Sequence, residues 1–372
     1  MNSKLNNNTL SKDSMVKQLL LPLEQFLNQG GITEIAINRP YEAWTETNQG
    51  WQRHDLPEFG MAEIKSLANV IATYTNQKIG EENPILSAQL PNGERIQIVL
   101  PPAIEQNTVS MTIRIPDESN RSFEDYEKQG FFNKFRYGKP KDFANYKSVL
   151  RPEDIKLVEF LERKDLSGFF KFAVQCKKNI AVVGDTGSGK TTFMKAICQY
   201  VPLDERLVTI EDVRELFVPH GNKVHLLYSK GGQGKAKVTP SDLIASNMRM
   251  KPDRVLLAEL RGGEAFDFLK LLTTGHSGSI TSYHAESCSL AYDRYVFMCK
   301  EHEQANIYES STLKELVALT IDIIVHVDVQ KKYDEDANLI GKDRFISEIK
   351  FDPVAKLKAQ FGEAEIIVGD EK

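Results

Sequence analysis

One segment of this chain matches the phosphate-binding pattern G-x-x-x-x-G-K-[ST] at every position: Gly184-Asp185-Thr186-Gly187-Ser188-Gly189-Lys190-Thr191. The apolar run NIAVVG leads into it, and the helical stretch KTTFMKAICQY follows. A strand, a glycine-rich turn and a helix in this order aim backbone N–H groups and a helix N-terminus at bound phosphate. The motif therefore predicts that the chain binds a nucleoside triphosphate.

The residue types in this motif each have a chemical purpose. The glycines let the backbone wrap the phosphates, Lys190 is expected to reach the β and γ phosphates, and the Thr191 hydroxyl is expected to bind Mg²⁺. The predicted nucleotide site comprises Gly184, Asp185, Thr186, Gly187, Ser188, Gly189, Lys190, Thr191 and Thr192.

Length and periodicity indicate how the chain is organised around this motif. At about 150 residues per domain, 372 residues predict two domains. Within 151–372, apolar segments bounded by Gly alternate with helical stretches, which predicts an α/β domain with a mainly parallel sheet. Residues 1–116 combine helical stretches with strands joined by turns such as Pro91-Asn92-Gly93, which predicts a smaller α+β domain.

The segment 117–150 differs from both of its neighbours because it is rich in aromatic residues. A free tether would be rich in Gly and Ser. We expect either a connector that docks onto its own chain or a neighbouring one, or a third small subdomain. The aromatic residues are Phe123, Tyr126, Phe131, Phe132, Phe135, Tyr137, Phe143 and Tyr146.

Hydrolysis of a bound triphosphate needs a further carboxylate near the metal, and two predicted strand ends offer one. Glu211 and Asp212 close the segment RLVTIED, and Glu259 closes DRVLLAEL. Strand C-termini gather at the ligand edge of an α/β sheet, so both sets could reach the phosphates. We predict that one carboxylate orients the attacking water and that the other coordinates Mg²⁺ through water.

Two histidines flank a further predicted strand: His276 at its entry and His284 at its exit. Histidine can donate to a phosphate or respond to its loss. Without nearby Cys or ordered carboxylates, the pair is weak evidence for a metal site, and an isolated pair favours a structural role.

Composition narrows the remaining classes of function. The net charge of −5, from 47 basic and 52 acidic residues, argues against strong direct nucleic-acid binding. The four cysteines lack metal-ligand spacing and are expected to be buried thiols. The polar N-terminus resembles no signal peptide, and no apolar run is long enough to span a bilayer, so we expect a cytoplasmic protein whose membrane contact is peripheral.

Four blocks in fixed order closely resemble the Walker A, Asp box, Walker B and His box of the secretion ATPase superfamily. They are GDTGSGKT, VTIEDVRELFVP, KPDRVLLAELRGGEAFDFL and TGHSGSITSYHA. The segment LLYSKGGQGKAKVTPSDLIASNMRM resembles the hexameric traffic ATPases of type IV secretion and conjugation. Two departures are Ala258, where that family is expected to have Gly, and Pro116-Asp117-Glu118, which lengthens the segment after Arg114.

The resemblance implies a RecA-like domain in a homo-hexamer that binds ATP and Mg²⁺ between its two domains. It also implies residue roles: Lys190 and Thr191 at the phosphates, Glu211 as catalytic carboxylate, and Glu259 as the Walker B residue. Thr191, Glu211 and Glu259 form the implied metal set. His276 and His284 are the implied His-box residues near the γ-phosphate and subunit contacts, and Arg114 is implied to reach the phosphates from the N-terminal domain.

The leading hypothesis is thus an ATP-hydrolysing motor of a type IV secretion system. It would energise substrate transport or pilus assembly together with inner-membrane components, at the cytoplasmic face of the inner membrane. The alternatives are a type II secretion or type IV pilus motor, a RecA-type nucleic-acid translocase, and a non-hydrolysing scaffold. The transported substrate, a swapped position of the N-terminal domain, and the choice between Glu211 and Glu259 as the water-orienting group stay open.

Overall fold

The structure is a computed structural model that describes residues 13–116, 121–228 and 238–362. The chain divides into two compact units. Unit 1 contains the described residues of Met1–Asp117 together with Lys331–Lys342, and unit 2 those of Glu118–Tyr228, Val238–Gln330 and Asp343–Lys372. Residues 117–118 and 229–237, which belong to two segments used for the family resemblance, lie outside the described residues.

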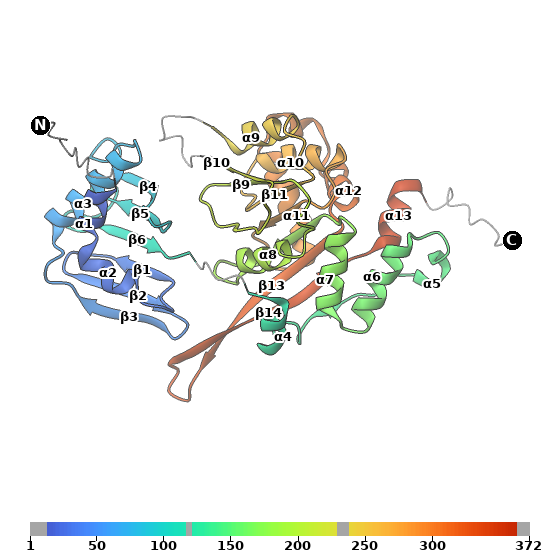
Figure 1. Cartoon of the computed structure of the whole chain (residues 1–372), viewed down its shortest axis with the longest axis horizontal. Coiled ribbons are helices and arrows are strands. Elements are labelled where there is room, and N and C mark those ends of the chain that lie inside the picture. The colour runs from blue at the N-terminus through green and yellow to red at the C-terminus, as the bar shows by residue number, and fades with distance from the viewer. Residues whose placement is uncertain (1–12, 117–120, 229–237, 363–372) are drawn as a thin grey trace, which may run out of the picture. The chain divides into compact units, whose positions relative to one another are not determined.

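Unit 1 is an α+β unit, as predicted, with helices beside an antiparallel sheet (Figure 1). Two short helices, Ser14–Leu19 and Leu21–Leu27, open this unit, and Pro22 lies in the first turn of the second, because proline suits the first turn of a helix but not its interior. The elements are α1 Ser14–Leu19, α2 Leu21–Leu27, β1 Glu34–Ile37, β2 Glu42–Thr47, β3 Gly50–Asp55, α3 Met61–Tyr74, β4 Ile85–Gln89, β5 Arg95–Val99 and β6 Ser110–Arg114.

The order of the strands in this sheet is β3-β2-β1-β6-β5-β4. Helix α3 buries one apolar face, including Ile64, Leu67 and Ile71, in the core of unit 1. The Glu63 carboxylate accepts a hydrogen bond from the backbone N–H of Gly60 at 3.1 Å, which satisfies a donor that has no partner within the helix α3. The predicted turn between β4 and β5 has Gly93 at a φ of +106°.

Unit 2 is an α/β unit whose sheet has the strand order β10-β9-β11-β12-β8-β13-β14-β7. Strands β10, β9, β11, β12, β8 and β13 run parallel, which confirms the predicted RecA-like class. The strands are β7 Arg136–Tyr137, β8 Ile180–Val183, β9 Leu207–Glu211, β10 Lys223–Leu227, β11 Arg254–Leu257, β12 Ile280–Tyr283, β13 Ile323–Tyr333 and β14 Leu339–Lys350.

The helices of unit 2 cover both faces of this sheet. They are α4 Phe123–Lys128, α5 Phe143–Tyr146, α6 Pro152–Glu162, α7 Leu166–Gln175, α8 Lys190–Cys198, α9 Pro240–Asn247, α10 Glu264–Thr273, α11 Cys288–Lys300, η2 Glu303–Ile307, α12 Ser310–Thr320 and α13 Pro353–Phe361. Among the elements of unit 2, the sequence patterns did not predict α4, β7, α5, α6, α7, β10, η2, α12 or α13.

The strand β8 explains why its sequence is a continuous apolar run. Ile180 and Val182 pack into the core on one face of the sheet, whereas Ala181 and Val183 pack into the core on the other face. All four side chains are buried, because helices cover both faces of a parallel sheet.

The aromatic residues of 121–150 pack in the core of unit 2, and four of them surround Phe193 of α8: Phe123, Tyr126, Phe131 and Phe132. The ring centroid of Phe193 lies 5.3 Å from that of Phe131 and 5.6 Å from that of Tyr126. Phe170 of α7 completes the contact at 5.2 Å. The helix that follows the phosphate-binding motif is therefore anchored by the aromatic segment.

Three of the four cysteines, Cys198, Cys288 and Cys299, are buried free thiols, as predicted, and Cys176 is partly exposed. Burial raises the pKa of each of the three buried thiols to about 12. In the described part of the chain, no helix combines the length and the apolar character needed to cross a membrane.

The packing around Phe193 generates a stability prediction. Replacing Phe193 by Ala removes a fully buried ring and leaves a cavity, so we expect unfolding free energy to fall by about 3–5 kcal/mol. The matched control is Phe297→Ala on α11, whose ring is 64% exposed and should cost less than about 0.5 kcal/mol. Urea unfolding followed by circular dichroism measures both, and equal losses would contradict the packing role.

Candidate nucleotide site

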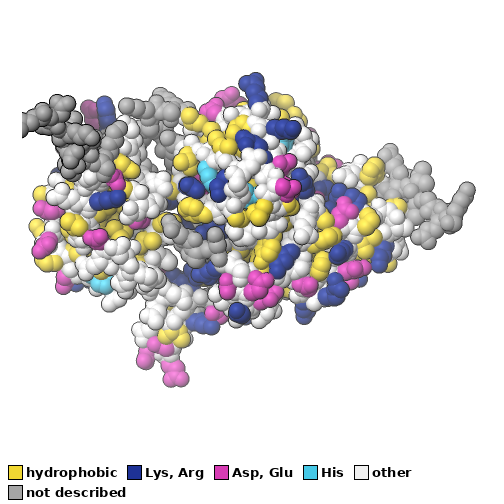
Figure 2. All heavy atoms as spheres, viewed as in Figure 1, with side chains coloured by type: hydrophobic (Ala, Val, Ile, Leu, Met, Phe, Trp, Pro, Cys, Tyr) yellow, Lys and Arg dark blue, Asp and Glu magenta, His cyan; other side chains and the backbone are white. Residues whose placement is uncertain are grey.

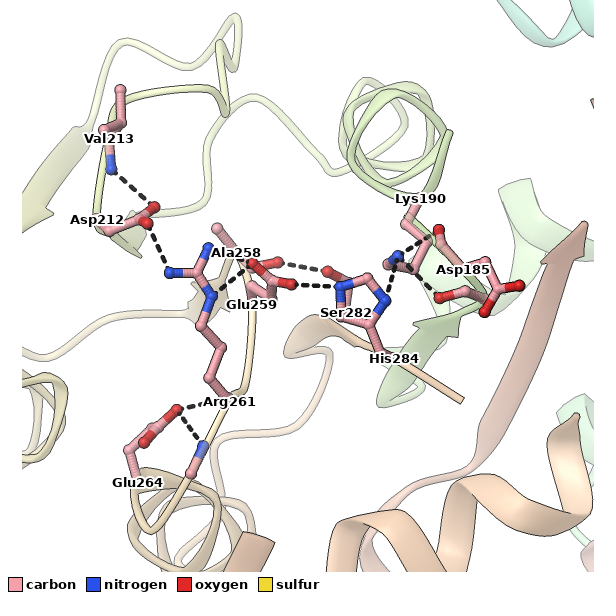
Figure 3. A network of polar contacts seen from close by, with 12 residues as sticks. Asp185, Lys190, Asp212, Val213, Ala258, Glu259, Arg261, Glu264, Ser282 and His284 are labelled. Carbon is pink, nitrogen blue, oxygen red and sulfur yellow. Dashed lines mark hydrogen bonds and ion pairs between the residues drawn. The ribbon is translucent and has the colours of Figure 1, made fainter. Parts of the chain in front are cut away.

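The parallel sheet of unit 2 brings several predicted site residues to one edge. Gly184 follows β8, Glu211 ends β9, Glu259 lies two residues beyond β11, and His284 follows β12. Because these strands are parallel neighbours, their carboxyl ends share an edge, where ligands of open α/β sheets bind. Figure 3 shows the contacts that connect the residues at this edge.

The loop between β8 and α8 requires glycine at its first position. Gly184 has a φ of +148°, and a Cβ there would lie only 2.1 Å from the carbonyl oxygen of Val327 on β13. Gly187 and Gly189 also have positive φ angles, of +75° and +98°. The neighbouring strand and the backbone conformation therefore both exclude a side chain where the loop leaves the sheet.

The predicted phosphate-binding residues differ in exposure. Asp185, Thr186 and Gly187 are exposed, and Thr191 and Thr192 are partly exposed in the first turn of α8. Ser188 is fully buried, and its hydroxyl has no hydrogen-bond partner within the described residues. An unsatisfied buried hydroxyl inside a cradle of this shape is consistent with a ligand that supplies the missing partner.

Lys190 is buried at the start of α8, and its ammonium group is held by its own loop. The Nζ atom donates to the carbonyl oxygens of Gly184 and Asp185, both at 2.8 Å, and lies 3.3 Å from Nδ1 of His284. A buried ammonium group needs such acceptors to offset its lost hydration. These contacts hold the charge of Lys190 at the mouth of the loop.

His284 connects Lys190 with the carboxylate of Glu259. Nε2 of His284 lies 3.1 Å from Oε1 of Glu259. Burial lowers the pKa of His284 and the Lys190 ammonium lowers it further, while Glu259 opposes both effects. A neutral imidazole fits this arrangement, because Nε2–H can donate to Glu259 while Nδ1 accepts from Lys190.

Arg261 extends the same network to a second carboxylate (Figure 3). Its Nε donates to Oε2 of Glu259 at 2.8 Å, and another guanidinium nitrogen donates to Oδ2 of Asp212 at 2.8 Å. Burial alone would lower the pKa of Arg261, but the Asp212 and Glu259 carboxylates have the larger combined effect and raise it. Positive and negative groups thus alternate from Lys190 to Asp212, with His284 between the lysine and Glu259.

Glu211 lies at the same edge but makes different contacts. Its side chain is fully buried and accepts from the Thr209 hydroxyl at 2.8 Å, and from the backbone N–H groups of Glu215 and Leu216 at 2.7 and 2.8 Å. The carboxylate thereby fixes the loop after β9. The next residue, Asp212, is the one whose side chain meets Arg261.

One other predicted site residue of unit 2, His276, lies away from this cluster. His276 precedes β12 and so lies at the opposite edge of the sheet from His284, and its Nδ1 is 3.2 Å from the Thr274 hydroxyl. Arg114 ends β6 in unit 1, where it pairs in register with Glu34 and Arg95. Within unit 2, therefore, His276 does not join Lys190, and Arg114 belongs to the other unit.

The donors at this edge are compatible with Mg²⁺. Among the described residues, no group of three His, Cys, Asp or Glu side chains could hold a metal ion. Mg²⁺ bound with a nucleotide needs fewer protein ligands, because phosphates and waters fill most of its octahedron. The hydroxyl of Thr191 and the carboxylate of Glu259 supply oxygen ligands of the required kind.

Sequence patterns placed Asp212 among the candidate carboxylates, but they did not assign Arg261 or Arg344 to the site. Arg261 lies two residues beyond Glu259, so its nearness to the carboxylate was a readable signal. Arg344 of β14 donates from Nε to the carbonyl oxygen of Gly187 at 3.0 Å, across 157 residues of sequence. Local spacing cannot reveal such a contact.

Comparison with known proteins gives matches along most of the chain. A family model described as Type II/IV secretion system protein matches residues 147–335. The type IV secretion system protein VirB11 of Bartonella henselae is 42% identical over 353 residues, which cover 94% of this chain and 96% of that protein. VirB11 of Brucella suis is 43% identical over 340 residues, covering 91% of this chain and 90% of that protein.

Solved structures give a consistent result. The crystal structure of the VirB11 ATPase from the Brucella suis type IV secretion system, in complex with sulphate, is 41% identical, with a TM-score of 0.51 over 94% of this chain and 98% of that chain. The pilus retraction motor PilT with bound ADP shares the fold alone, at 13% identity and a TM-score of 0.54 over 92% of this chain and 85% of that one. The chain therefore belongs to the type II/IV secretion system protein family and, within it, to the traffic ATPases of type IV secretion.

Proposed function

We propose that this chain hydrolyses ATP at the loop between β8 and α8 and that the free energy drives transport or pilus assembly by a type IV secretion system. The observation that carries the proposal is the network in which the Lys190 ammonium meets Glu259 through His284. A phosphate-binding cation and a carboxylate able to orient water lie in one connected network, as phosphoryl transfer requires. The VirB11 relatives support the biological setting, because they are type IV secretion system proteins.

The contacts of Lys190 suggest how nucleotide binding reaches the carboxylate. Two of its acceptors are neutral carbonyls of its own loop, whereas the β and γ phosphates offer charged oxygens. Charge-assisted hydrogen bonds are roughly twice as strong as neutral ones, so we expect Lys190 to turn toward the phosphates. That movement changes its contact with His284 and, through His284, the position of Glu259.

The remaining roles at the edge follow from chemistry and from the family resemblance. Backbone N–H groups of the loop hold the phosphates, the Thr191 hydroxyl and Glu259 hold Mg²⁺ directly or through water, and Glu259 or Glu211 orients the attacking water. Mg²⁺ bound with ATP neutralises charge that develops on the phosphoryl oxygens. The backbone bonds of Glu211 favour a role in fixing the loop that carries Asp212, which leaves Glu259 as the favoured water-orienting group.

The assembly is also part of the proposal. A homo-hexamer at the cytoplasmic face of the inner membrane, in contact with membrane components of the secretion machine, suits a traffic ATPase. We also propose that the chain has three parts: an N-terminal domain of residues 1–116, a docking connector of residues 117–150, and an ATPase domain of residues 151–372. In such a ring Arg114 would act on the phosphates and His276 at a subunit contact, roles that rest on the motif resemblance.

Removing the Lys190 ammonium should abolish turnover. We expect Lys190→Ala to lower steady-state ATP hydrolysis by at least about a hundredfold, because the phosphates lose a fixed cation. Phosphate release measures the rate, and Lys314→Ala is the control, since Lys314 lies on α12 in an exposed pair with Asp293. Normal hydrolysis by Lys190→Ala would reject the assignment of the loop.

Substitutions of Glu259 and Glu211 should have different effects on ATP turnover and on protein stability. Glu259→Gln is expected to cut hydrolysis about a hundredfold or more while the protein still binds ADP. Glu211→Gln should lower the free energy of unfolding by about 1–3 kcal/mol, because a neutral amide oxygen accepts from the Glu215 and Leu216 N–H groups more weakly than a carboxylate oxygen does. Measuring ATP turnover and urea unfolding for both variants decides which glutamate is catalytic and which one stabilises the loop. A stable Glu211→Gln variant without turnover would instead make Glu211 the catalytic carboxylate.

The ring and its arginine can be tested together. We expect the mass in solution with ATP to be that of six chains, and Arg114→Ala to reduce hydrolysis about tenfold or more without changing that mass. Arg39→Ala is the matched control, because Arg39 is a highly exposed arginine of unit 1. Unchanged hydrolysis in a six-chain Arg114→Ala assembly would rule out the proposed role of Arg114.

A further inference from the structure

Arg344 lies against the phosphate-binding loop although it comes from the last strand pair of the chain. Its Nε donates to the carbonyl oxygen of Gly187 at 3.0 Å, and a Cβ on Gly189 would lie 3.3 Å from its Cδ atom. The strand order β8-β13-β14 explains this reach, because β14 is only two strands from the strand that carries the loop. The guanidinium group therefore lies beside the turn that is predicted to wrap the phosphates.

The loop has two flanks with different chemistry. On the flank of β12 and β11, Lys190 meets His284 and Glu259. The opposite flank is formed by β13 and β14, and it presents Arg344. Hydrolysis requires the γ-phosphate to face the carboxylate that orients water, so the reacting end of the triphosphate belongs on the β12 flank. The α-phosphate and the nucleoside must then lie on the other side of the loop, which is the flank formed by β13 and β14.

The chemistry of Arg344 suits that position. A guanidinium is always protonated, and its planar N–H groups match phosphate oxygens in bidentate geometry. Arg344 is only partly buried, so its charge is held near the loop without the full desolvation cost of an interior arginine. A phosphate oxygen is also a stronger acceptor than the Gly187 carbonyl that Arg344 contacts here.

We propose that Arg344 is a nucleotide-binding residue that donates to the α-phosphate of bound ADP or ATP. The inference rests on the proposed nucleotide site and adds a ligand contact from β14 to it. Arg344 contributes equally to holding the nucleotide in the ground state and in the transition state, while Glu259 acts on the reacting phosphate. Its loss should therefore raise the Kd for ADP and the KM for ATP equally, and leave kcat nearly unchanged.

The experiment compares Arg344→Gln with Arg344→Lys in the full-length protein. Gln keeps a donor for the Gly187 carbonyl but removes the charge, and Lys keeps the charge. Calorimetric titration with ADP should give a Kd about tenfold higher for Arg344→Gln and within about threefold of wild type for Arg344→Lys, as expected for one charge-assisted hydrogen bond. Lys350→Gln is the matched control on the same strand, since Lys350 is 47% exposed and pairs with Asp352.

The outcomes separate this inference from the proposed function. If wild type binds ADP and hydrolyses ATP but Arg344→Gln has the same Kd as Lys350→Gln, Arg344 is not a nucleotide contact. If kcat falls together with affinity in Arg344→Gln, Arg344 shapes the loop through Gly187, and the α-phosphate contact is rejected. Failure of the wild-type protein to bind ADP would overturn the proposed function itself.

Discussion

The site depends on the burial of β8 between β12 and β13 in a parallel sheet. Both faces of β8 are covered by core side chains, and the carbonyl of Val327 on β13 closes against Gly184. A strand held on two edges and two faces gives the loop that follows it a fixed starting point. The phosphate-binding backbone, the lysine at the start of α8 and the neighbouring strand ends all derive their positions from this constraint.

Beyond the sheet, an aromatic cluster and a charge network hold the two ends of the site. Phe193 of α8 packs against aromatic rings of residues 121–150, so this aromatic segment supports the helix that begins with Lys190. On the ligand side, Lys190, Glu259, Arg261 and Asp212 alternate in sign, which offsets the cost of partly burying each charge (Figure 3). A change at the phosphates can pass along this network because its members contact one another directly.

The surface outside the site has a different character. In Figure 2 the basic side chains on the visible face of unit 2 are interspersed with acidic and apolar ones. This mixture on the visible face agrees with the net charge of −5. If nucleic acid is transported, we expect other components to hold it.

Local pattern was sufficient for the phosphate-binding loop, most strands of the parallel sheet and the α+β character of unit 1. Each of these depends on neighbours in sequence: glycine spacing, apolar runs and turn residues. The edge strand β10 was missed because its residues are only half-buried and show no continuous apolar run. Helix α7 was missed although Asp165 caps it by accepting the N–H of Gly168, which was a readable signal.

Neighbouring residues were enough to locate the nucleotide loop between a buried strand and a helix, and to identify the carboxylates that end the adjacent strands. Which side chains meet at that loop became clear from the three-dimensional fold. His284 is 94 residues from Lys190, yet the pairing of β12 with β8 brings the two side chains into contact. Arg344 is 157 residues from Gly187, yet strand order brings them into contact. Sheet pairing sets these distances, and it depends on contacts between residues that no local pattern connects.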